Sequence, residues 1–198
     1  MKTASMTTRV PTLADILLPR SGAVEKTLLA IGGSLLLAVS AKIQVPFWPV
    51  PMTLQSLTVL LIGLGFGSRL GAATVLLYLG EGFLGLPVFA GAIAGPAYMA
   101  GPTGGYLLGF LLSAAAVGAL AERGWDRNLL RASAAIAAGH VLLFIPGVLW
   151  LTFLFGWTKA VAVGVTPFVA ATILKTALGV AIIALMWKLA DRERRPKV

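Results

Sequence analysis

Long apolar runs, separated by short polar segments or by segments rich in Gly and Pro, dominate the chain. A bilayer core of about 30 Å takes roughly 20 apolar helical residues, and fewer where flanking Gly or Pro lets the chain re-enter protein. Six runs meet this requirement, at residues 27–42, 53–68, 69–81, 104–122, 130–156 and 170–187. Only the corner Gly67-Ser68-Arg69 separates the second run from the third, which predicts a tight helical hairpin. The pattern therefore predicts an all-α integral membrane protein with six transmembrane helices.

Basic residues lie mostly on one side of this predicted bundle. Of the 16 Lys and Arg residues, only Lys42 and Lys159 fall on the other side, and Lys175 lies inside the last run. The positive-inside rule then places both termini in the cytoplasm. We predict a mobile cytoplasmic arm over residues 1–26, one six-helix membrane domain over 27–190 and a charged cytoplasmic tail over 191–198. The chain is expected to cross a membrane several times.

The first run has a second interpretation. Lys26, the apolar run 28–38 and the small residues at 39–41 resemble a signal peptide with its cleavage site. The polar stretch before them is unusually long for a signal peptide, and five further spans need no cleavable signal. An uncleaved first helix is therefore favoured.

Composition excludes most other classes of protein. Hydrophobic residues make up 58% of the chain and charged residues 12%, which is too apolar for a soluble domain. The net charge of +9 is explained by topology, so nucleic-acid binding has no support. The chain has no Cys and a single His, His140, which excludes a multi-His or Cys-based metal site. No phosphate-binding loop, zinc motif or catalytic triad is found, so we expect no catalytic residues, no enzyme and no cofactor.

The outer loops carry the main functional signal. Residues 42–55, 82–103 and 157–170 are long, nearly uncharged and dense in Pro, Gly and aromatic residues. Loops this apolar are poor solvated connectors, so we expect them to fold over the spans and enclose a partly dry cavity. The alternative is an aromatic belt in the headgroup region, an interpretation of equal weight for Tyr98 and Trp157.

Lys175 is the charge that most needs an explanation, because a charged residue inside a span is costly and usually functional. Thr172 shares its helical face. The alternative to a ligand role is snorkelling to the outer interface. Glu81 is a candidate partner for Lys175, a second ligand contact or an interfacial residue, and His140 is expected to be a hydrogen-bonded packing residue.

Two stripes of small residues follow helical spacing. Gly101, Gly105, Gly109 and Ser113 form one, and Ala30, Ser34 and Ala38 form the other. Such stripes usually mean close helix packing, with partner docking as the less common alternative. At the start of the run 104–122, free backbone N–H groups also offer donors to an anionic or carbonyl group of a ligand.

Three motifs occur in order along the chain: AKIQVPFWPVPMTLQ at 41–55, YLGEGFLGLPVF at 78–89 and GPTGGYLLGF at 101–110. Together they resemble the BioY family, the biotin-specific substrate-binding (S) components of energy-coupling factor transporters. The resemblance implies six helices, cytoplasmic termini and an outward-facing biotin pocket. It also implies docking on a transmembrane coupling protein that carries two cytoplasmic ATPases, with Ala30, Ser34 and Ala38 matching the family's docking positions.

The resemblance also bears on the start of the last helix. Many family members read Pro-Phe-x-Pro-Gly-Asp-x-x-Lys there, with the Asp and the Lys facing biotin, and this chain reads PFVAATILK at 167–175. Lys175 is retained, whereas Thr172 stands at the Asp position. A hydroxyl still donates to and accepts from a ureido group.

We therefore expect a biotin site in which side chains and backbone supply polar contacts and aromatic residues supply the walls. The expected polar contacts come from Thr172, Lys175 and the backbone of Gly104 and Gly105, the walls from Trp48, Phe89 and Tyr106, and the motifs add Gln55 and Thr103. Which end of biotin meets Lys175 stays open. The alternative function is a solitary carrier or channel for biotin or another small solute.

Overall fold

The structure, a computed structural model, describes residues 9–19, 22–46 and 48–193. Helices make up nearly all of it: α1 (Leu13–Leu17), α2 (Ala23–Lys42), α3 (Gln55–Phe83), α4 (Pro96–Met99), α5 (Gly104–Ala121), α6 (Leu129–Phe155), α7 (Trp157–Gly164) and α8 (Val169–Glu193). Two 3-10 turns, η1 (Trp125–Arg127) and η2 (Thr166–Phe168), complete the helical elements. A minimal antiparallel hairpin of β1 (Gln44–Val45) and β2 (Met52–Thr53) lies in the first outer loop.

Five helical stretches among the described residues are long and apolar enough to cross a membrane. They are Ala23–Lys42, Gln55–Phe83, Gly104–Ala121, Leu129–Phe155 and the stretch Trp157–Arg192, which contains α7, η2 and most of α8. Large apolar side chains cover their outer faces, among them Leu35, Leu149, Phe153, Ile173 and Leu174. Such a surface is stable only against lipid or a partner. The chain is therefore an all-α membrane protein with five to six apolar helices.

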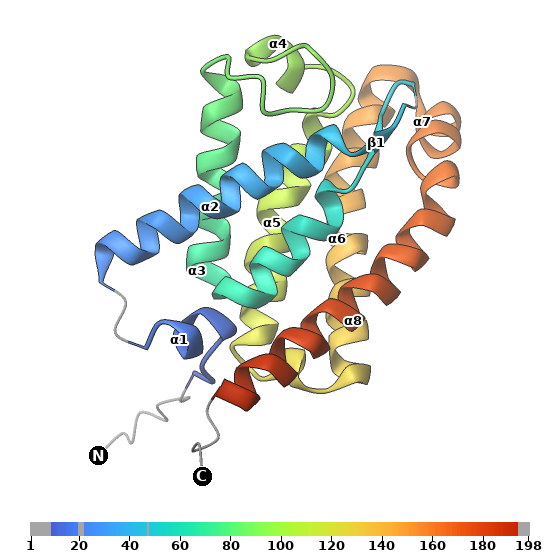
Figure 1. Cartoon of the computed structure of the whole chain (residues 1–198). Helices are drawn as coiled ribbons and strands as arrows, with labels where there is room; N and C mark the ends of the chain where they lie inside the picture. Colours follow the sequence, from blue (N-terminus) through green and yellow to red (C-terminus); the bar gives the residue numbers. More distant parts are fainter. Residues whose placement is uncertain (1–8, 20–21, 47, 194–198) are drawn as a thin grey trace, which may run out of the picture.

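Gly67 bends α3 into two arms. Its φ of 82° is a conformation that L side chains rarely adopt, and the residues on either side are helical. Figure 1 shows the two arms diverging from this bend as a V. The corner lies where the sequence predicted it, and residues 55–66 and 68–83 form the two arms of the predicted hairpin.

Close packing of α5 against α6 explains the stripe of small residues on α5. A Cβ on Gly105 would lie 2.3 Å from the carbonyl oxygen of Pro146, and one on Gly109 would lie 2.4 Å from that of Leu143. One turn further on, the Ser113 hydroxyl donates to the carbonyl oxygen of Gly139 at 2.9 Å. The backbones of the two helices thus approach each other without intervening side chains, so packing accounts for this stripe.

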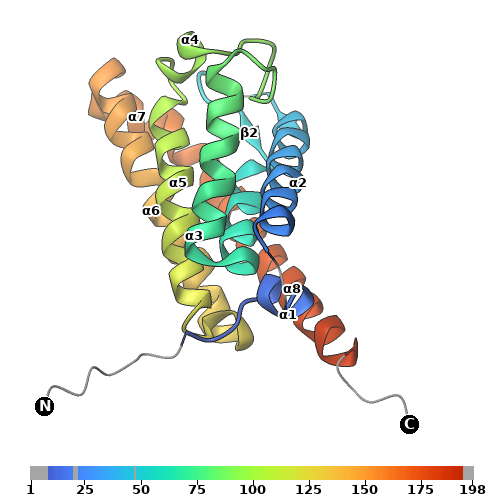
Figure 2. The same cartoon turned by 90° about the vertical axis from the view of Figure 1, so that its left-hand side faces the viewer.

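The two ends of the described chain lie at one end of the bundle, and α4, the β hairpin and α7 lie at the opposite end (Figures 1 and 2). Buried residues form two clusters. One contains Tyr78, Phe89, Tyr106 and Phe110 among others, and the second joins Leu13 and Ile16 of α1 to residues that include Leu64, Val117 and Trp187.

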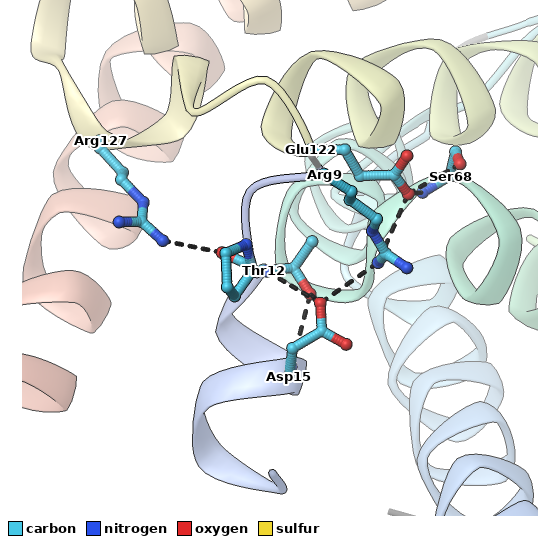
Figure 3. Close-up of polar contacts among 7 residues, drawn as sticks. Arg9, Thr12, Asp15, Ser68, Glu122 and Arg127 are labelled. Carbon is cyan, nitrogen blue, oxygen red and sulfur yellow. Dashed lines mark hydrogen bonds and ion pairs between the residues drawn. The ribbon is translucent and has the colours of Figure 1, made fainter. Parts of the chain in front are cut away.

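A packed segment takes the place of much of the predicted mobile arm. Thr12 caps α1 and forms a capping box with Asp15, whose carboxylate accepts from the Thr12 backbone N–H at 2.9 Å. Arg9 lies 3.2 Å from Asp15 and 3.5 Å from Glu122 at the end of α5 (Figure 3). Leu13 is buried because the apolar face of α1 packs on the bundle. This is a tertiary contact, so the local sequence pattern did not predict it.

The ends of the predicted domain shift as well. Helix α2 begins at Ala23, inside the predicted arm of residues 1–26, and α8 runs to Glu193, inside the predicted tail of residues 191–198. Residues 1–8, 20–21 and 194–198 of these two predicted segments lie outside the described residues.

Candidate ligand-binding site

A cavity opens at the end of the bundle opposite the termini. It encloses about 540 Å³ of empty space, open solvent at its mouth included, and draws its lining from the first outer loop, α3, the loop that contains α4, and α5, α6 and α8. The lining residues are Val50, Pro51, Thr53, Gln55, Ser56, Ala90, Tyr98, Thr103, Tyr106, Leu107, Phe110, Leu143, Phe144, Phe168, Thr172 and Lys175.

Lys175 points into the protein. Its Nζ donates to the carbonyl oxygen of Thr53, just before α3, at 2.7 Å and to the hydroxyl of Ser56 in the first turn of α3 at 2.9 Å. These contacts favour an inward position over snorkelling. An ammonium group has three N–H donors, so one remains for a ligand in the cavity.

Polar side chains continue from Lys175 along the same wall. Thr172 lines the cavity one turn before it on α8. The Gln55 amide donates to the hydroxyl of Tyr78, which in turn donates to the carbonyl oxygen of Val88 at 2.9 Å. This chain of hydrogen bonds fixes the orientation of the Gln55 amide and satisfies buried polar groups that would otherwise be costly.

Aromatic side chains supply much of the rest of the cavity wall. Tyr106 on α5 contacts Phe144 on α6 edge to face at 5.8 Å, and Phe144 contacts Phe168 at 6.1 Å. The Tyr106 hydroxyl donates to the carbonyl oxygen of Gly164 at 2.7 Å, which ties α5 to the end of α7. The Tyr106 ring packs against Gly147 and supplies apolar surface to the cavity wall.

Tyr98 brings a further ring to the cavity from the outer loop 82–103. Its ring stacks on Phe89 at 4.8 Å, and Phe89 is fully buried behind it. Burial raises the pKa of the Tyr98 phenol, so its hydroxyl stays neutral and can donate a hydrogen bond near neutral pH. The alternative of an interfacial belt is thus disfavoured for Tyr98.

The cavity gathers five of the predicted ligand residues and leaves four outside. Lys175, Thr172, Gln55, Thr103 and Tyr106 line it. The remaining four are Gly104, Gly105, Trp48 and Phe89.

Those four have other places in the structure. A Cβ on Gly104 would lie 1.9 Å from the carbonyl oxygen of Met99, so this glycine, like Gly105, allows close packing. Phe89 supports Tyr98 from behind. Trp48 is largely exposed and lines a wider outer opening with Tyr98 and Thr103, two residues that also line the cavity.

Several lining residues were not predicted, namely Thr53, Ser56, Tyr98, Phe110, Phe144 and Phe168. The sequence held a signal for four of them. Thr53 and Phe110 lie in the first and third motifs, Phe168 lies in the segment 167–175, and Tyr98 lies in the uncharged outer loop 82–103. Phe144 lies on a helix in apolar surroundings, where a cavity wall and a packed core have the same sequence pattern.

The predicted docking residues of α2 face the interior. Ser34 is fully buried and its hydroxyl donates to Glu81, while Ala30 and Ala38 are only partly exposed. Glu81 therefore has Ser34 as its partner, and it does not contact Lys175. The exposed face of α2 carries other residues: Leu28, Ile31, Leu35, Leu36 and Val39.

His140 is buried at the contact between α6 and α8. Its Nδ1 lies 3.3 Å from the Thr176 hydroxyl, one residue after Lys175. This contact agrees with the expected packing role. Among the described residues no group of three or more His, Cys, Asp or Glu side chains comes close enough together to hold a metal ion.

Fold and cavity together define a class: a small polytopic membrane protein with a cavity at one end of its helical bundle. The chain belongs to the BioY family, whose model matches residues 6–192. It is a transport protein of that family and not an enzyme.

Individual relatives agree with this assignment. The chain is 38% identical to Biotin transporter BioY2 of Lactococcus lactis subsp. cremoris, over 79% of this chain and 88% of that one. It is 39% identical to Biotin transporter BioY of Thermotoga maritima, over 80% of this chain and 93% of that one. Its fold resembles the crystal structure of the S-component for biotin from an ECF-type ABC transporter, with a TM-score of 0.66, 23% identity and coverage of 83% of this chain and 92% of that chain.

Proposed function

We propose that the protein captures biotin in the cavity described above and delivers it across the membrane. The observation that carries the proposal is Lys175, a charged residue inside a membrane helix whose amine faces a cavity walled by aromatic rings. Biotin presents a ureido group, a carboxylate and an apolar thioether ring. A site with one cation, several hydroxyls and amides, and aromatic walls complements all three.

In the proposed arrangement the cavity faces the outside and both termini lie in the cytoplasm. The distribution of Lys and Arg supports this orientation. The protein acts as the binding subunit of an energy-coupling factor transporter in a bacterial cytoplasmic membrane, and its partners are a transmembrane coupling protein and two cytoplasmic ATPases. The names of the relatives support the ligand, and the likeness to the S-component supports the type of assembly.

Calorimetry with biotin on the purified full-length protein tests the proposed site. Lys175→Met removes the cation and keeps much of the side-chain length, and Lys188→Met, on the same helix near the end that carries the termini, is the matched control. Hydrogen bonds to charged groups contribute about 1.5–3 kcal/mol, so we expect Lys175→Met to weaken affinity by about 10- to 100-fold. The control should bind as the native protein does.

Three results separate the alternatives. Unchanged affinity in Lys175→Met would remove this residue from the site, and a native protein that does not bind biotin would refute the ligand. Uptake of biotin into vesicles that contain this chain alone would instead establish a solitary carrier. Repeating the titrations with the amide of biotin shows whether the Lys175 amine meets the carboxylate.

A further inference from the structure

A groove runs along the outside of the bundle between α1, α2 and α3. Its first part lies near the end that carries the termini, where Lys26 and Arg69 line about 870 Å³ of open space together with Arg9 and Asp15. Its second part shares Leu29 and Phe66 with the first part and continues along α2. We call these two connected parts the α2 groove.

The polar part of the α2 groove carries unneutralised positive charge. Arg9 is paired with Asp15 at 3.2 Å and with Glu122 at 3.5 Å (Figure 3). Lys26 and Arg69 are exposed, and within the part of the chain that the structure describes neither forms an ion pair. Two exposed cations without an ion pair thus face the same open space, which favours an anionic occupant.

The second part of the groove is almost entirely apolar. Leu28, Leu36 and Phe66 line it, and a Cβ on Gly32 would meet no atom within 4 Å. The one acid at its edge, Glu25, accepts a hydrogen bond from the backbone N–H of Gly22 at 2.8 Å and so caps α2. The groove therefore joins a cationic end to an open apolar channel on a membrane helix.

We propose that the α2 groove binds one anionic glycerophospholipid. Its phosphate contacts Lys26 and Arg69, and an acyl chain lies along Leu29, Gly32 and Leu36. Basic pockets beside membrane helices hold acidic lipid headgroups in this way, and long cationic side chains reach the headgroup region from helix ends. The proposal concerns the lipid-facing side of the bundle and does not depend on the ligand of the cavity.

Native mass spectrometry of the full-length protein in a delipidating detergent tests this site, with phosphatidylglycerol and phosphatidylcholine as probes. We expect the native protein to bind one phosphatidylglycerol more tightly than phosphatidylcholine. The double variant Lys26→Gln with Arg69→Gln should weaken that binding by about 30-fold, since each cation near a membrane surface contributes about a factor of five. The matched control, Arg123→Gln with Arg131→Gln, removes two exposed cations from the same end of the bundle and should keep it.

A second variant tests the apolar part separately. Gly32→Phe fills the open channel without touching the cations, so it should also weaken phosphatidylglycerol. Equal losses of phosphatidylglycerol affinity in the groove double variant and in the control double variant would refute the site. The lipid would then be attracted by the positive charge of the whole end of the bundle and not by the groove. A further result to look for is inorganic phosphate displacing the lipid equally well from the native protein and from Gly32→Phe. That result would show that the groove binds anions through its cations alone, and it would overturn the proposal of a lipid site. Unchanged lipid binding in both groove variants, with loss of a co-purifying protein, would assign the groove to that protein and overturn the proposal.

Discussion

Gly105 separates two explanations for the small residues at the start of α5. If its backbone N–H contacts a ligand, Gly105→Ala should alter affinity and leave stability nearly intact. If Gly105 allows close packing, the added methyl group must displace backbone. The structure favours packing, because a Cβ at this position would lie 2.3 Å from the carbonyl oxygen of Pro146 and 2.4 Å from Cβ of Trp150.

The expected magnitude follows from these distances. Neither neighbour is the far end of a flexible side chain, so α5 and α6 must move apart, and overpacking of this kind costs about 1–3 kcal/mol. The higher helix propensity of Ala offsets about 0.5–1 kcal/mol of that cost. The net loss in the free energy of unfolding should be about 0–2.5 kcal/mol, centred near 1 kcal/mol. Gly65→Ala in α3 is the matched control. A Cβ on Gly65 meets nothing within 4 Å, so this variant gains the higher helix propensity of Ala without overpacking.

Thermal unfolding of both variants in the same detergent measures this difference. We expect Gly105→Ala to unfold at a lower temperature than the native protein, and Gly65→Ala at an equal or higher one. Biotin calorimetry on the same samples should show a smaller affinity for Gly105→Ala, since Tyr106 moves with α5. A Gly105→Ala protein as stable as the Gly65→Ala control, with reduced affinity, would refute the packing explanation and restore Gly105 as a ligand contact.

Two further predictions concern the end of the bundle near the termini. Glu122 accepts hydrogen bonds from both the backbone N–H and the hydroxyl of Ser68 at 2.8 Å and lies near Arg9. Glu122→Ala should therefore make residues 9–18 more sensitive to limited proteolysis. An unchanged cleavage pattern would contradict this role. Asp126 lies outside the spans, and burial raises its pKa, which the N–H of Trp187 only partly opposes. The folded protein therefore favours protonated Asp126. The stabilisation from this protonation is complete below the unfolded pKa of about 4 and is lost as the pH rises through the higher folded pKa. Asp126→Asn should consequently gain stability relative to the native protein between pH 4 and 7, and thermal unfolding across that range measures it.

The helices were predictable because long apolar runs and glycine corners are local features. Gly67 is the clearest case, since a Gly-Ser-Arg corner between two short runs has few other interpretations and the structure bends there. Lys175 was equally visible, because a cation in an apolar run has no local explanation. Its place on the cavity wall follows from the fold.

Other parts of the site were hidden for physical reasons. A glycine at a helix start serves ligand contact and helix packing equally well, so Gly104 and Gly105 were ambiguous until α6 was placed beside them. Phe89 and Tyr98 lie in the same apolar loop, and only the way that loop folds back decides that Tyr98 faces the cavity and Phe89 lies behind it. The docking of α1 likewise depends on partners more than 40 residues away, such as Leu64 and Trp187.

The position of Lys175 links the cavity to the most lipid-exposed part of the bundle. In an apolar 18-residue stretch of the span that contains α8 only 17% is buried, so this helix has less packing than the other spans. Near the cavity, its polar tie to α3 is the amine of Lys175, bonded to Thr53 and Ser56. We expect a ligand bound by the third N–H of this amine to contact the same group that ties α8 to the start of α3. Occupancy of the cavity and the position of α8 would then be coupled through one side chain.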